Sequence, residues 1–249
     1  MRHPDDPAVL RWIKAQHEKG AKVIGICVGA LVVANAGLLD GKRATAHWYY
    51  LDRMLKEHPS IHYVPNRRVV VDGRVATTTG ISASMPMALT LIEAIAGREK
   101  AETTARELGV NRWGIRHNSA VYKFTRPFAL TALGNKLAFW NHEDLGLELT
   151  PGMDEVTLAL VADAWSRTYR SRAVTFAASM SAIETRGGLR IFPEKAATDW
   201  PATRLLAPLG QRPPADALDD TLGQVTVRYG IDTSRFVAMQ LEYTKQAAL

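Results

Sequence analysis

The feature that most constrains the fold is a junction between two apolar segments, with the only cysteine of the chain, Cys27, lying between them. "AKVIGIC" (21–27) is short and rich in β-branched residues, which predicts a parallel strand covered on both faces. "GALVVANAGLLDG" (29–41) is apolar all round, which predicts a buried helix ending near Gly37. The chain must therefore turn sharply from one buried element into the next at Cys27.

The flanking sequence alternates strand and helix patterns, which indicates an α/β layered sheet. Asp6 and Pro7 have the residue types that begin a helix, and Asp72-Gly73 between two β-rich runs predicts a hairpin. The predicted elements on both sides of the junction are a helix over 6–20, a strand over 42–48, a helix over 49–58, a hairpin over 67–80 and a helix over 82–97.

A second α/β region follows a polar stretch with scattered aromatic residues over 98–127 and a helical pattern over 128–140. We predict an elbow-containing half over 1–108, a connector over 109–144 and a second half over 145–249. The elements predicted for the last part are strands over 145–152 and 172–179, a turn followed by a strand over 182–194, a short strand over 202–210, and helices over 153–171, 213–230 and 232–246.

Composition narrows the function classes. The 249 residues are 47% hydrophobic with a net charge of +6, and no apolar run approaches the roughly 20 residues that cross a bilayer. The start has no signal-peptide pattern, and one cysteine cannot form an internal disulfide, so we expect a reducing, cytoplasmic location. We expect no metal site, because thiolate pairs and metal-ligand histidine spacings are absent. The histidines interpreted as mostly surface residues are His17, His58, His62, His117 and His142.

The junction has the properties of a nucleophile elbow. Gly25 and Gly29, two residues before and after Cys27, would let neighbouring backbone pass close by. The amino end of the following helix would favour the thiolate and lower the pKa of the thiol. A buried, inert cysteine fits the same pattern, and the residues alone leave both readings open.

Two segments resemble the ThiJ/PfpI superfamily, within the class I glutamine-amidotransferase-like fold. They are "GAKVIGICVGALVVANAGLLDGKRATAHW" (20–48) and "VVVDGRVATTTGISASMPMALTLIEAIAG" (69–97), and the resemblance covers about residues 5–108. It implies a flavodoxin-like three-layer α/β sandwich with a mostly parallel sheet. It further implies Cys27 as the elbow thiol, His47 as its base or orienter, the Val28 amide as an oxyanion donor, and a Thr79-Gly80 turn beside the thiol pocket.

The chain also departs from that family pattern. The protease-like branch has a histidine directly after the cysteine, whereas this chain has Val28, so peptidase activity is not expected. Other members use a glutamate from their first strand–helix turn. "LGLELTPGMDEVTLALVADAW" (145–165) resembles that turn and puts Glu155, or alternatively Asp154, at the glutamate position. Simple helix capping is the competing reading, which we prefer for Asp154 and leave open for Glu155.

Two arrangements explain an opening-strand pattern that follows the elbow. In one, the chain is the remainder of a tandem protein that has lost its first N-terminal half. In the other, the halves are swapped in order, and 145–210 complete the sheet begun by 20–108. We favour the first, with a second copy covering the exposed sheet edge in a homodimer.

By resemblance, the chemistry would be thiolate addition to a carbonyl or acyl carbon of a small metabolite, in an amidase, hydrolase or glyoxalase-like reaction without a metal or organic cofactor. The sequence leaves open whether the chain is an enzyme. The alternatives are a non-enzymatic redox sensor and a ligand-binding module associated with a transcription regulator. "AETTARELGVNRWGIRHNSAVYKF" (101–124) faintly resembles a helix-turn-helix with Gly109 at the turn, but we prefer a solvated connector. A small-molecule ligand is expected as partner, and nucleic acid and membranes are not.

Overall fold

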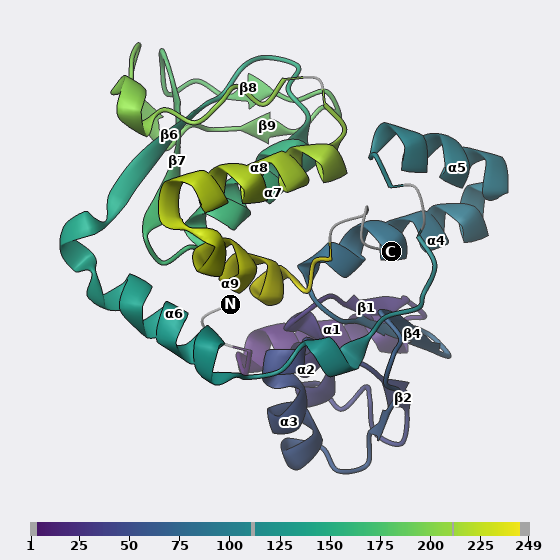
Figure 1. The fold of residues 1–249 in the computed structure, drawn as a ribbon. Coiled ribbons are helices and arrows are strands. Elements are labelled where there is room, and N and C mark those ends of the chain that lie inside the picture. The colour runs from purple at the N-terminus through teal and green to yellow at the C-terminus, as the bar shows by residue number, and fades with distance from the viewer. Residues whose placement is uncertain (1–3, 111–112, 211, 245–249) are drawn as a thin grey trace. The chain divides into compact units, whose positions relative to one another are not determined.

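The computed structural model describes residues 4–110, 113–210 and 212–244 (Figure 1). The chain forms two compact units, with unit 1 made of Met1–Ala105, Asn111–Phe124 and Leu241–Thr244, and unit 2 of Arg106–Val110, Thr125–Gln240 and Lys245–Leu249. The predicted connector 109–144 is therefore divided between the two. Among the described residues, every helix falls short of the length and apolarity needed to cross a membrane.

The elements around the cysteine form as predicted. Helix α1 (Pro7–Glu18) begins at Asp6, whose carboxylate accepts the Ala8 amide at 2.8 Å. Strand β1 (Val23–Gly25) and helix α2 (Gly29–Asn35) follow. The continuous apolar character of α2 is explained by its burial, because the five residues from Ala30 to Ala34 are each at most 4% exposed.

The sheet of unit 1 has the order β1-β5-β4. β1 pairs in parallel with β5 (Val75–Thr78), and β5 pairs antiparallel with β4 (Val69–Asp72) in the predicted hairpin. The two turn residues are Gly73 and Arg74, one position later than the predicted Asp72-Gly73 pair. Gly73 has φ +62°, which favours glycine at the first turn position.

Shorter elements complete unit 1. Strands β2 (Arg43–Ala44) and β3 (His62–Tyr63) pair in parallel, with α3 (Trp48–Glu57) between them. The helices after the hairpin are η1 (Ile81–Ala83), α4 (Ser84–Ala96) and α5 (Arg98–Glu107). Leu31, Leu39, Met54 and Val75 pack in one core cluster, each at most 2% exposed. Burying such a side chain contributes about 1.5–3 kcal/mol, so this cluster fixes α2 against β5 and α3.

The described residues do not form the helix-turn-helix that 101–124 faintly resemble, in agreement with the preference for a different structure there. After α5 the chain turns at Gly109, which has φ +70°. Of the described residues from 113 to 124, only Ser119–Val121 are helical, as the 3₁₀ turn η2. A recognition helix long enough to enter a groove is therefore missing from this described stretch.

Unit 2 has a parallel three-stranded sheet of order β10-β7-β6. Its strands are β6 (Glu143–Glu148), β7 (Ser171–Ala177) and β10 (Lys195–Ala196), and a separate hairpin joins β8 (Ile183–Glu184) to β9 (Arg190–Ile191). The helical elements are α6 (Arg126–Leu137), η3 (Phe139–Asn141), α7 (Glu155–Ser166), η4 (Ala202–Arg204), α8 (Pro214–Tyr229) and α9 (Ile231–Leu241).

One strand predicted in unit 2 is wrong. Residues 202–210 begin with η4, and their only β pairing in the described chain is a single bridge from Leu205 to Gly146. β6 pairs with β7, and β1 pairs with β5, so these strands belong to different sheets. The interpretation of the chain as a tandem remainder stays a prediction.

Candidate functional site

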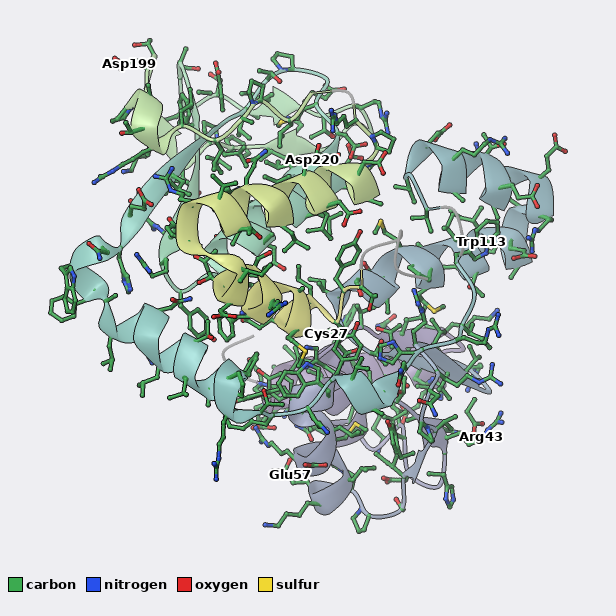
Figure 2. All side chains as sticks on the ribbon, viewed as in Figure 1. Cys27, Arg43, Glu57, Trp113, Asp199 and Asp220 are labelled. Atoms are coloured by element: carbon green, nitrogen blue, oxygen red, sulfur yellow. The ribbon has the colours of Figure 1, made fainter. Side chains whose placement is uncertain are left out.

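Cys27 lies in the turn between β1 and α2, and its backbone is left-handed, with φ +56° (Figure 2). Its amide donates to Thr78 Oγ1 at 3.2 Å, and its carbonyl accepts the Ala30 amide at 3.2 Å. The left-handed region is unfavourable for a residue with a side chain and persists only where surrounding contacts impose it. The predicted sharp turn at a half-buried Cys27 is therefore present.

The first turn of α2 is tight. The Gly29 amide donates to the Ile26 carbonyl at 2.8 Å, and the Leu31 amide donates to Val28 at 3.1 Å. Together with the Ala30 amide, which donates to Cys27, the first three amides of α2 therefore donate to carbonyls of the elbow residues. Val28 is the N-cap of the helix and has helical backbone angles.

The two glycines beside Cys27 have different roles. A Cβ at Gly25 would lie 2.9 Å from backbone atoms of Gly29 and Ala30, so only glycine permits this approach of β1 to α2. A Cβ at Gly29 would meet no atom within 4 Å. The expectation that both glycines allow close backbone passage is correct for Gly25 and wrong for Gly29.

The carboxyl end of β5 supplies a threonine-rich turn beside the elbow. Thr78, which accepts the Cys27 amide, is fully buried and donates its hydroxyl to the Thr79 carbonyl at 3.3 Å. Thr79 is buried, and its amide donates to the Arg68 carbonyl at 3.0 Å. Since β1 and β5 run in parallel, their carboxyl ends bring Cys27 and Thr78 to one sheet edge.

Glu242, from the short C-terminal part of unit 1, anchors the next residue of that turn. Its carboxylate accepts the Gly80 amide at 2.8 Å and the Trp48 amide at 2.7 Å, and the residue is 4% exposed. A Cβ at Gly80 would lie 2.5 Å from the Glu242 Cβ, so this approach requires glycine. Ser82 also donates to the Glu242 carbonyl at 2.8 Å. Glu242 therefore joins the loops that follow β2 and β5.

His47, the predicted base or orienter, is the N-cap of α3 and is 5% exposed. Its Nδ1 accepts the Tyr49 amide at 3.1 Å. An accepting Nδ1 puts the proton of the neutral ring on Nε2, which makes that nitrogen a donor. The ring lies 5.6 Å from the Trp48 ring and 6.1 Å from the Tyr50 ring. Its predicted role at Cys27 stays a prediction.

A cavity of about 260 Å³ lies beside the Glu242 carboxylate and Thr79. His117 lines it, with Nε2 3.5 Å from Glu242 and its ring stacked on Tyr122 at 5.0 Å. Burial lowers the pKa of His117, and Arg68 lowers it further, whereas the Glu242 charge acts in the opposite direction. Burial likewise raises the pKa of Tyr122. His117 is an exception among the five histidines expected to be mostly surface residues, because its side chain is 8% exposed.

The two acidic candidates at the start of α7 belong to unit 2. Asp154 caps the helix by accepting the Thr157 amide at 2.7 Å and pairs with Arg186 at 2.6 Å, as the capping interpretation predicts. Glu155 accepts the Gly187 amide at 3.2 Å. A role for Glu155 at Cys27 stays a prediction.

Sequence reasoning missed Glu242 and the paired His117. The carboxylate reaches Gly80 from 162 residues further along the chain, and no local pattern marks that separation. Across the described residues, no three histidine, cysteine or acidic side chains gather in a way that could hold a metal ion.

Comparisons with known proteins point to one family for the elbow segment. Residues 2–94 match the DJ-1/PfpI family. Over 105 residues the chain is 38% identical to the isonitrile hydratase of Pseudomonas putida, an alignment of 42% of this chain and 44% of the hydratase. Over 106 residues it is 33% identical to the HTH-type transcriptional regulator CdhR of Pseudomonas aeruginosa, an alignment of 43% of this chain and 31% of the regulator.

The crystal structure of Drosophila melanogaster DJ-1beta aligns with a TM-score of 0.39 and 28% identity, over 44% of this chain and 57% of that one. The chain thus spans less than half of the hydratase and about a third of the regulator. The predicted α/β, flavodoxin-like class is confirmed by the family match. Parallel pairing in both units, between β1 and β5 and between β6 and β7, agrees with it.

Proposed function

From the match of residues 2–94 to the DJ-1/PfpI family, we propose that Cys27 is a nucleophile toward an electrophilic carbon of a small metabolite. The observation that carries the proposal is the left-handed backbone of Cys27 at the junction of a buried strand and a buried helix. A strained residue at such a turn presents its side chain at the edge of the sheet. The start of α2 then favours the thiolate over the thiol.

The hydrogen bonds of the elbow support an assignment of roles. The amides of Cys27, Gly29 and Ala30 already have acceptors. We therefore assign the Val28 amide as the donor to negative charge that develops on the attacked group. His47 presents an Nε2 proton in its neutral form, which supports the orienter role over the base role. Thr78 fixes the position of Cys27 by accepting its amide.

Isonitriles are one substrate class to test, because a relative is named for their hydration. Attack of the Cys27 thiolate on the terminal carbon would form the Sγ–C bond, while that carbon takes up a proton to give a thioimidate, R–N=CH–S. The nitrogen would take up its proton when water adds in the next step. Water would then add to that carbon, and the Sγ–C bond would break to release an N-substituted formamide and the thiolate. The sum is R–NC + H₂O → R–NH–CHO. Amides and 2-oxoaldehydes test the hydrolase and glyoxalase-like alternatives.

The experiment incubates the full chain with an alkyl isonitrile, a simple amide and a 2-oxoaldehyde, and follows the products by NMR. We expect turnover of at least one substrate, with Cys27→Ala and Cys27→Ser lowering the rate by at least about 10³-fold. Ser60→Ala, which changes an exposed side chain, serves as the matched control and keeps the rate of the unaltered chain. Turnover that survives in Cys27→Ala would refute the proposal.

A ligand-binding module without turnover is the second candidate, because the chain is similar to the HTH-type regulators CdhR and GbdR of Pseudomonas aeruginosa. A redox sensor is a third reading of the same elbow. Mass spectrometry after mild peroxide treatment separates them. A stable sulfinate on Cys27 without turnover supports sensing, whereas an unreacted thiol with a pKa near the ordinary value of about 8.5 supports a binding module. The homodimer and the cytoplasmic location stay predictions.

A further inference from the structure

A cavity of about 750 Å³ lies in unit 2 at the amino ends of β6 and β7. This is the edge where the first residues of the two strands, Glu143 and Ser171, pair with each other. The volume is in the range of sites for small organic molecules. Its wall includes Lys136, Glu143, Asp144, Tyr169, Arg170 and Arg172.

Both carboxylates of the wall are already neutralised by neighbouring arginines. Glu143 accepts Arg228 Nε at 2.8 Å and Arg228 Nη2 at 2.6 Å, and Tyr229 donates its hydroxyl to the same carboxylate. These hydrogen bonds hold the pKa of Glu143 below its ordinary value. Asp144 accepts Arg172 Nε at 3.1 Å and Nη2 at 2.8 Å. Neither carboxylate is therefore left to neutralise the remaining cations of the wall.

Those cations carry uncompensated charge. Within the described part of the chain, neither Arg170 nor Lys136 forms an ion pair. The Nε of Arg170 is buried and has no hydrogen-bond partner there. The guanidinium carbon lies 5.1 Å from the centre of the Tyr229 ring, which orients the group without neutralising it. Arg204 lies 3.8 Å from Glu143, which is already paired with Arg228. The wall is left with a surplus of positive charge.

An aromatic ring lines the same cavity. Tyr169 is 45% exposed and has a left-handed backbone, with φ +59°. Its ring meets the Phe236 ring edge-on at 5.1 Å, so the exposed ring is held in place. A held aromatic surface beside cations suits a ligand with an apolar or planar part as well as an anionic part.

We propose that this cavity binds a phosphomonoester, with Arg170 and Lys136 contacting the phosphate and Tyr169 contacting the organic part. A guanidinium offers several donors to phosphate oxygens, and an ammonium adds a mobile point charge. A phosphate dianion matches two cations without protein counter-charges. The cavity is larger than an inorganic phosphate ion. We therefore assign the volume that the phosphate does not fill to the organic group of the ligand. The site lies wholly in unit 2 and does not depend on the chemistry of Cys27.

Isothermal titration calorimetry of the full chain at low salt tests the site, with phenyl phosphate and inorganic phosphate as probes. We expect saturable binding of phenyl phosphate, weakened about tenfold or more in Arg170→Gln and about three- to tenfold in Lys136→Gln. Arg235→Gln is the matched control, because Arg235 is an exposed arginine of unit 2 whose side chain lies 3.8 Å from Asp232. It retains the affinity of the unaltered chain within about twofold.

Three outcomes would overturn the proposal. One is the absence of saturable binding up to about 10 mM phenyl phosphate. Another is equal affinity in Lys136→Gln, Arg170→Gln and the unaltered chain. The third concerns the organic part: inorganic phosphate binding as tightly as phenyl phosphate would exclude the role of Tyr169, whereas Tyr169→Ala should remove an observed preference. Circular dichroism checks folding, and Lys136→Gln decides the phosphate assignment if Arg170→Gln does not fold, because Lys136 is exposed.

Discussion

Replacement of Glu242 by glutamine tests whether the elbow region depends on an anchor from the far end of the chain. The carboxylate receives two amides, those of Trp48 at 2.7 Å and Gly80 at 2.8 Å, and lies 3.5 Å from His117. Glutamine has nearly the same shape but only one accepting oxygen. Its NH₂ group would face one of the two amides, so that amide would lose its acceptor and meet another donor.

The magnitude follows from these contacts. A hydrogen bond to a charged group contributes about 1.5–3 kcal/mol, and a buried donor left without an acceptor costs about 1–3 kcal/mol. Since one of the two amide bonds to Glu242 is lost and the other becomes neutral, we expect a loss of about 2–4 kcal/mol in the free energy of unfolding of unit 1. The loss of negative charge would also lower the pKa of His117 further, because Glu242 is the group that raises it.

Hydrogen exchange read by NMR at the Trp48 and Gly80 amides measures this effect locally, and urea unfolding measures it for the chain. Glu242→Gln should speed exchange at both amides by at least about tenfold. Glu99→Gln changes an exposed glutamate of the same unit and should stay within about 0.5 kcal/mol of the unaltered chain. Unchanged exchange at both amides, with an unfolding free energy within about 0.5 kcal/mol, would refute the anchoring role.

Three further predictions concern stability and are read from urea unfolding midpoints. Gly25→Ala places a Cβ 2.9 Å from the backbone of the next helix and should lower the free energy of unfolding by more than about 2 kcal/mol. Gly29→Ala meets no atom and should leave that free energy unchanged or raise it by up to about 1 kcal/mol. Equal effects of the two substitutions would contradict the close approach at Gly25. Burial lowers the pKa of His117 below 6.5, so stability should fall as the pH drops through about 6.5, and His117→Gln should remove that dependence. Arg228→Met should cost about 1–3 kcal/mol at pH 7, and because Arg228 lowers the pKa of Glu143, the difference should shrink as the pH falls below about 4.5; a pH-independent difference would contradict it.

The features predicted correctly from the sequence are those fixed by neighbouring residues. Asp6 caps α1 because its carboxylate reaches amides two and three residues away. The apolar pattern of α2 predicts its burial, because no face of the helix is polar. The close backbone approach at Gly25 is also a local feature. Only three residues separate β1 from α2, so the two elements must approach closely there.

The features that were missed depend on contacts between distant residues. The helix predicted over 232–246 includes Glu242, whereas α9 ends at Leu241, and nothing in "QLEYT" reveals that the Glu242 carboxylate binds Gly80. His117 lies in a polar stretch that resembles a solvated connector, yet its buried side chain stacks on Tyr122 and lies 3.5 Å from Glu242. The strand predicted over 202–210 has the right composition but forms one bridge, since composition does not specify a pairing partner.

The elbow and the Glu242 anchor come from different parts of the chain. Gly25, Cys27 and Thr78 lie within the segment that matches the family, whereas Glu242 and His117 lie outside it. A reaction step that depends only on the geometry of the thiol would be determined by residues of the segment that matches the family. The stability of the Gly80 turn and the walls of the neighbouring cavity instead depend on residues that this chain supplies from elsewhere. If Cys27 acts as proposed, we expect substitutions at those supplied residues to change which substrates are turned over, and substitutions at Cys27 to abolish turnover of every substrate.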